Sequence, residues 1–229
     1  MDEDHNAAPL NPVPWVVWLL ALPMIAMEVV LSLGSSGVVG GPQAIGWHIQ
    51  AVERFGLFPE LLKHQWETGG YPPGELHRLV SYVVVHGSFT HTLFAVVMVL
   101  ALGNMVASVF RWWAVLVVFL GSAAIGGVAY GLLVPGLRTQ LIGAYPGIYG
   151  LIGAFTFLIW TKLALVGANR LRAFTLIGML LAVQLVFGLL FGGGWDWVAE
   201  VAGFATGFLL SFVVSPEGFR RVVAILRQR

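Results

Sequence analysis

Cysteine is absent from this chain of 229 residues, and charged residues are scarce. Without cysteine the protein cannot form a disulfide, a thiolate metal site or a thiol nucleophile. Lys, Arg, Asp and Glu make up only 10% of the residues and give a net charge of +1, so no basic patch is available to match a nucleic-acid backbone. From these absences we expect no cofactor, no bound metal and no nucleic-acid partner.

Long uncharged runs dominate instead. Hydrophobic residues make up 58% of the chain, and its mean hydropathy is +0.86. A membrane-spanning helix needs about 20 predominantly apolar residues, because each residue rises 1.5 Å along the helix. The sequence therefore predicts an all-α integral membrane protein with six transmembrane helices, at residues 14–33, from about 91 onward within 79–110, 112–134, 147–166, 173–191 and 197–214.

A long segment between the first two spans, residues 34–78, is not transmembrane. Ile45, Ile49 and Val52 recur in it at helical spacing, and Trp66 suits the headgroup region of a bilayer. We predict one or two short helices lying in the membrane interface. The alternative is a plain aqueous loop.

Lys and Arg are distributed unevenly around the predicted spans. Eight flank the second-to-third and fourth-to-fifth connections or the C-terminal tail, and four lie on the other side, at Arg54, Lys63, Arg78 and Arg138. Because cytoplasmic loops carry the excess of these residues, the tails 1–13 and 215–229 are predicted to be cytoplasmic and loop 34–78 external. The first residues are acidic rather than basic, so the first apolar run is interpreted as a retained span in a bacterial inner membrane.

Three short motifs carry a resemblance to a known family. They read His-Gly-Ser-Phe-Thr-His at 86–91, Gly-Ala-Tyr-Pro-Gly-Ile-Tyr-Gly at 143–150 and Ala-Glu-Val-Ala-Gly-Phe at 199–204. They resemble the rhomboid family of intramembrane serine proteases, in which the second motif is Gly-Ala-Ser-Gly-x-x-Tyr-Gly and the third Ala-His-x-x-Gly-Phe. The resemblance implies a six-helix rhomboid-like bundle over residues 14–214.

Two positions depart from the family at its catalytic dyad. Tyr145 stands where the family has the serine nucleophile, and Glu200 stands where it has the histidine base. His91 matches the first residue of a His-x-x-x-Asn pair that serves the oxyanion, but the second position is Ala95, which has no donor. Tyr149 matches the tyrosine that packs on the catalytic ring. Three glycines match packing positions of the family: Gly150, Gly203 and Gly207.

No serine lies near the start of the fourth predicted span, and no histidine lies in the sixth. We therefore predict a catalytically inactive relative, a pseudoprotease, that binds transmembrane segments of client proteins within the lipid bilayer. The candidate residues of its cleft are His86, His91, Tyr145, Tyr149 and Glu200.

Several alternatives stay open. Glu200 activating water would make the chain an unorthodox protease, and Glu28 with Glu200 would suit a proton or ion pathway, or with His91 a metal site. A purely structural interpretation has Tyr145 and Glu200 hydrogen-bonded to each other, with His86 and His91 capping the second span.

Overall fold

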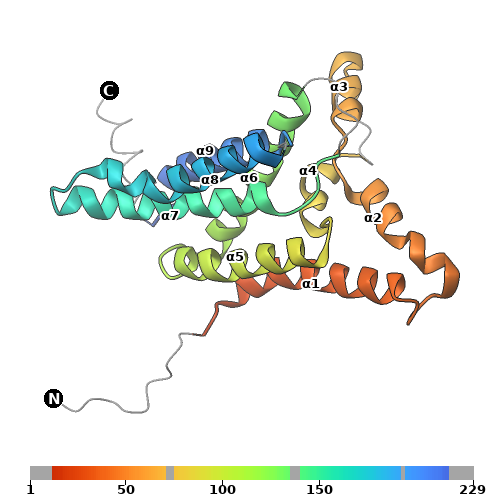
Figure 1. Cartoon of the computed structure of the whole chain (residues 1–229). Coiled ribbons are helices and arrows are strands. Elements are labelled where there is room, and N and C mark those ends of the chain that lie inside the picture. Colours follow the sequence, from red (N-terminus) through yellow and green to blue (C-terminus); the bar gives the residue numbers. More distant parts are fainter. Residues whose placement is uncertain (1–11, 71–74, 135–139, 192–193, 217–229) are drawn as a thin grey trace, which may run out of the picture.

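The computed structural model describes residues 12–70, 75–134, 140–191 and 194–216, and within these ranges the fold is built from helices (Figure 1). The predicted tails 1–13 and 215–229 lie almost entirely outside the described residues. The helices, in chain order, are α1 (Trp15–Ser35), η1 (Gly41–Gly46), α2 (Trp47–Phe55), α3 (Pro59–Thr68), α4 (Arg78–Ser81), η2 (Tyr82–Val84), α5 (Phe89–Ala107), α6 (Trp112–Leu133), α7 (Tyr145–Leu165), η3 (Arg170–Phe174), α8 (Thr175–Phe191) and α9 (Asp196–Val214).

Five of these helices, α1, α5, α6, α7 and α9, are long and apolar enough to cross a bilayer. They begin and end close to five of the predicted spans, which confirms the all-α membrane class. The remaining prediction, residues 173–191, coincides with α8, which has only 17 residues. That length lies at the short end of the range for a crossing helix, so the sixth span stays a prediction.

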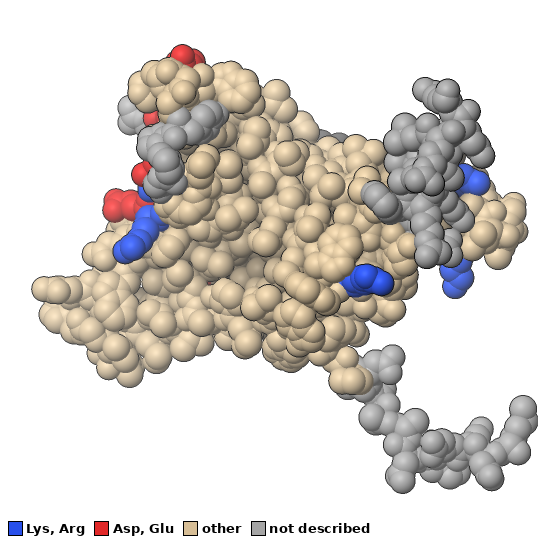
Figure 2. Space-filling view, turned by 180° about the vertical axis from the view of Figure 1, so that it is seen from behind, with Lys and Arg blue, Asp and Glu red and all other residues tan. Residues whose placement is uncertain are grey.

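Charged side chains are sparse on the molecular surface. Figure 2 shows one face on which a broad area carries neither Lys and Arg nor Asp and Glu, while the charged groups gather toward its ends. The spanning helices expose apolar side chains, including Leu120 and Ile125 of α6. An uncharged band of this kind is typical of a surface that faces lipid tails.

Helices α6, α7 and α9 make the most extensive helix contacts of the fold. Glycines bring α9 directly onto the backbone of α7: a Cβ at Gly203 would overlap the carbonyl of Pro146, and one at Gly207 would overlap the carbonyl of Gly150. Apolar surface gains little from helix association in a bilayer, so close backbone packing of this kind is a main source of stability.

A second pair of helices, α1 and α5, lies side by side along one edge of the bundle (Figure 1). Gly103 of α5 provides room for α1, because a Cβ there would lie 2.9 Å from Cγ1 of Val17. Val17 is completely buried as a result.

The segment between α1 and α5 is structured rather than an irregular loop, since it holds η1, α2, α3 and α4. Trp47 packs over the end of α1, where a Cβ at Gly34 would meet its ring at 2.8 Å. Trp66 of α3 and Ile45 and Ile49 beside or within α2 are strongly exposed. The external, interfacial position of this segment stays a prediction.

Candidate functional site

The first turns of α5, α7 and α9 converge on one cluster of polar and aromatic side chains. Ser88 caps α5, because its hydroxyl accepts a hydrogen bond from the backbone N–H of His91 at 3.2 Å. The His91 ring is held in turn by the backbone N–H of Gly87, which donates to Nδ1 at 3.3 Å. The side chain that caps the start of α5 is therefore Ser88. The purely structural interpretation had assigned this capping role to His86 and His91.

The His91 ring stacks on the ring of Tyr145 at the start of α7. Their centroids are 5.0 Å apart and their planes differ by 29°. Gly143 makes this contact possible: its φ of +102° belongs to a region that favours glycine, and a Cβ there would lie 3.0 Å from Cε1 of His91. Pro146 follows at the second position of the helix, where a missing N–H costs nothing.

His86 is the second histidine of the cluster and is almost fully buried. Its ring meets that of His91 edge to face at 5.1 Å, and its Nε2 accepts a hydrogen bond from the backbone N–H of Ala144 at 3.3 Å. Burial, reinforced by His91, lowers the pKa of His86 to about 4. The ring is neutral at pH 7, and its acceptor role at Nε2 places the proton on Nδ1.

Glu200 lies in the first turns of α9 and is only 6% exposed. Its Oε2 accepts a hydrogen bond from Nε2 of Gln184 on α8, and its carboxyl group also interacts with the Tyr149 hydroxyl one turn into α7. No hydrogen bond joins Tyr145 to Glu200 in the described part of the chain. The sequence allowed a hydrogen bond between Tyr145 and Glu200. In the structure each has a different partner, because Tyr145 stacks on His91 and Glu200 contacts Tyr149.

Two residues of this cluster were missed by sequence reasoning. Asp196 interacts electrostatically with both His91 and Glu200, and Gln184 bonds Glu200 directly. Each had a signal in the sequence. Asp196 precedes Glu200 by four residues and so shares its helix face, and Gln184 is a polar residue in the middle of an apolar run.

Ala95 is completely buried, one turn further into α5 than His91. Its methyl group offers no hydrogen-bond donor to the cluster.

Glu28 belongs to a different contact. Its Oε1 accepts a hydrogen bond from the hydroxyl of Ser32 at 2.8 Å, and its Oε2 accepts one from the hydroxyl of Thr92 at 2.6 Å. Glu28 thereby joins α1 to α5, whereas Glu200 joins α8 to α9. Among the described residues, no three His, Asp or Glu side chains are grouped closely enough to hold a metal ion.

Comparison with known proteins agrees with the motifs. The family model for the Rhomboid domain matches residues 73–217, which include every residue of the cluster around Tyr145 and Glu200. This chain belongs to the rhomboid family. With its five apolar helices, it is an integral membrane protein.

Two relatives illustrate the range of similarity. YdcA of Bacillus subtilis (strain 168), whose name assigns it to the rhomboid proteases, is 28% identical over 152 residues, which are 66% of this chain and 74% of the relative. RHOMBOID-like protein 4 of Arabidopsis thaliana is 30% identical over 141 residues, or 60% of this chain and 34% of the plant protein. This chain thus spans about a third of the length of the plant relative.

Proposed function

We propose that this rhomboid-family protein is a catalytically inactive member that binds transmembrane segments of client membrane proteins. The observation that carries the proposal is the stack of Tyr145 on His91 at 5.0 Å. In the family these two positions supply the nucleophile and an oxyanion donor, so a substrate carbonyl would need the space that the phenol ring fills. A phenol also stays protonated at neutral pH and is a weak nucleophile.

The surroundings of Glu200 support the same conclusion. A general base must reach the proton that it removes, whereas the carboxyl group of Glu200 is engaged by Gln184 and Tyr149. Pro146, next to the nucleophile position, has no backbone N–H that could stabilise an oxyanion.

Binding of client helices is supported by exposed apolar side chains on the two helices beside the cluster. Val183 and Val186 lie on α8, and Leu93 and Val97 lie on α5. A client helix that packed here would reach the cluster through the contact between Gln184 and Glu200. Helix association in a membrane depends on such close packing and on hydrogen bonds between helices.

A cleavage assay tests the loss of catalysis. The purified protein in liposomes is given a fluorogenic transmembrane substrate, with an active rhomboid protease as the positive control and Glu200→Gln alongside. We expect no product from either form of this protein. Product from the wild type that Glu200→Gln abolishes would instead establish an unorthodox protease and overturn the proposal.

We also propose that both termini are cytoplasmic, in a bacterial inner membrane. Lys162, Arg170 and Arg172 gather at the end of α7 and the following connection, where the guanidinium of Arg170 lies 4.8 Å from the centre of the Trp160 ring. Such a cation–aromatic pair suits the cytoplasmic interface. A C-terminal green fluorescent protein should fluoresce and a C-terminal alkaline phosphatase should be inactive; the reverse pattern would contradict this orientation.

A further inference from the structure

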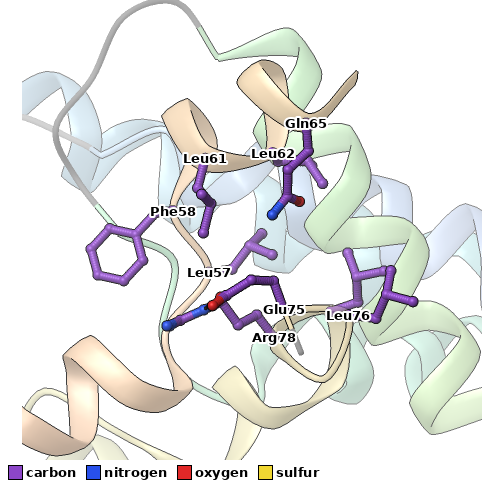
Figure 3. Close-up of a pocket in the computed structure, with 9 residues that line it drawn as sticks. Leu57, Phe58, Leu61, Leu62, Gln65, Glu75, Leu76 and Arg78 are labelled. Atoms are coloured by element: carbon purple, nitrogen blue, oxygen red, sulfur yellow. Dashed lines mark hydrogen bonds and ion pairs between the residues drawn. The ribbon is translucent and has the colours of Figure 1, made fainter. Parts of the chain in front are cut away.

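An apolar groove lies between α3 and α6, away from Tyr145 and Glu200. It encloses about 250 Å³ and is lined by Leu62, Trp66, Leu76, Leu79, Val128 and Leu132. A second, smaller pocket shares Leu62, Leu76 and Leu79 with the groove; Figure 3 shows this second pocket, called the inner pocket below.

The inner pocket contains a polar group without a partner. Gln65 is only 6% exposed, and in the described part of the chain its Nε2 has no hydrogen-bond partner. Figure 3 shows its amide group directed into the pocket. A buried donor without an acceptor is costly, and no described residue provides one for Nε2 of Gln65; we take the acceptor to come from a bound molecule.

The chemistry of the pocket favours a neutral acceptor. Arg78 is the cation of the inner pocket, and its guanidinium is already engaged: Nε donates to Glu75, and Nη1 donates to the backbone carbonyls of Glu53 at 2.6 Å and Gly56 at 3.0 Å. Glu75 balances its charge. A carbonyl oxygen fits this environment better than a phosphate does, since Arg78, the cation among the described lining residues, is already engaged.

The groove is continuous with the surface that faces lipid. Val128 and Leu132 belong to α6, a spanning helix, and Ile125 and Leu133 on the same helix are exposed. Trp66 stands at the rim with 63% of its surface exposed, as is usual for tryptophan at the headgroup level. An occupant that enters from this side comes from the bilayer.

We propose that the groove binds one diacyl phospholipid. An acyl chain lies against Leu79, Val128 and Leu132, and the ester carbonyl oxygen of that chain accepts a hydrogen bond from Nε2 of Gln65. The carbonyl oxygen takes the small space beside Gln65, about 10 Å³, while the acyl chain lies in the larger groove of about 250 Å³. This proposal is independent of the proposed function.

Competition between two lipids tests the proposal. The full-length protein, purified in detergent, is mixed with equal amounts of a diacyl phosphatidylethanolamine and its dialkyl-ether analogue, which has the same chains and headgroup but no ester carbonyl. Native mass spectrometry then counts bound lipids. We expect one retained lipid and a preference of about fivefold for the ester form, as one neutral hydrogen bond provides.

Three variants complete the experiment. Gln65→Leu should remove the preference for the ester, Leu132→Trp should fill the groove and remove binding of both lipids, and Gln50→Leu, a change at an exposed glutamine of α2, should change neither. A thermal unfolding curve establishes that each variant is folded. Leu132 is partly exposed, so Leu132→Trp is expected to fold even if Gln65→Leu does not.

Three results would overturn the proposal. Equal retention of the ester and ether lipids by the wild type would mean that Gln65 donates its hydrogen bond to a trapped water and not to a lipid. An ester preference that survives Gln65→Leu would place the carbonyl elsewhere. Lipid retention that survives Leu132→Trp would mean that ordinary surface lipid, and not the groove, accounts for the binding.

Discussion

Helix α9 contacts α6, α7 and α8, and the contacts with α7 and α8 differ in kind. Against α7 it packs backbone to backbone, at Gly203 and Gly207, where a Cβ would overlap a carbonyl of the other helix. Against α8 the described contact is one side-chain hydrogen bond, from Gln184 to Glu200. Helix α8 makes its main described contacts with η3, the element that directly precedes it in the chain.

The two interfaces of α9 have different roles: the one with α7 holds the helix bundle together, and the one with α8 belongs to the polar cluster around Glu200. The α7–α9 interface tolerates no added side chain, so the glycines of the family are retained at these positions. The contact between α8 and α9 depends on the side chains of Gln184 and Glu200, which can be exchanged without moving the backbone of α7. The close helix packing and the polar contact of Glu200 thus depend on different atoms of α9.

The largest effect is expected from breaking the α7–α9 interface. Gly207→Leu should lower the free energy of unfolding by about 3 kcal/mol or more, since the added side chain meets backbone that cannot move aside. Unfolding in detergent micelles measures the loss.

The matched control for Gly207→Leu is Gly178→Ala in α8, because no atom lies within 4 Å of a Cβ placed at Gly178. It should change stability by less than about 1 kcal/mol, and in the stabilising direction, since alanine favours helix. A large loss from the control, or none from Gly207→Leu, would remove the contrast between the two interfaces.

The next largest effect on stability is expected from His86, which belongs to the polar cluster and bonds the backbone just before α7. Its pKa in the folded protein is about 4, below the 6.5 of an unfolded chain. The unfolded chain therefore takes up the proton first, so the stability that His86 contributes is complete above about pH 6.5 and is lost as the pH falls toward 4. The loss amounts to about 3 kcal/mol.

His86→Gln isolates this contribution from those of other groups. Unfolding free energies of the wild type and the variant are measured between pH 7 and pH 4, and the difference between the two should shrink as the pH falls. A difference that stays constant over this interval would show that His86 does not titrate in it.

A smaller effect is expected at the α8–α9 contact. Gln184→Leu leaves the buried carboxyl group of Glu200 without its amide donor and should cost about 1–2 kcal/mol. The double variant Gln184→Leu, Glu200→Leu should recover only part of that loss, because both partners of this bond are then gone but the Tyr149 hydroxyl has lost its contact with Glu200. If Gln184→Leu unfolds like the wild type, the hydrogen bond does not hold α8 in place.

The sequence predicted the helices well, because their signal is local. Runs of apolar residues gave five of the spans to within a few residues, as at α6, which was expected over 112–134 and is found at Trp112–Leu133. The segment 34–78 was predicted to hold one or two short helices. Its division into η1, α2 and α3 did not follow from the sequence and is seen in the structure.

The site was predicted only in part, because its contacts join distant segments. The motifs identified Tyr145, Glu200 and His91, and the choice of partners did not follow from them. The stack of Tyr145 on His91 depends on Gly143 with its positive φ, and the bond from Gln184 depends on where α8 lies. Glu28 was a candidate for the same site, but the hydrogen bonds of its carboxylate go to Ser32 and Thr92 and not to Glu200.

Photo-crosslinking from α8 tests the central claim most directly. A photoreactive residue replaces Val186, which is exposed on α8, and in a matched sample it replaces Leu22, which is exposed on α1. Each protein is placed in liposomes with a labelled transmembrane peptide, and crosslinked and cleaved peptide are counted in the same sample. We predict crosslinks from position 186, few from position 22, and no cleaved peptide. Equal crosslinking from both positions, or cleaved peptide in either sample, would contradict a site that binds client helices without cutting them.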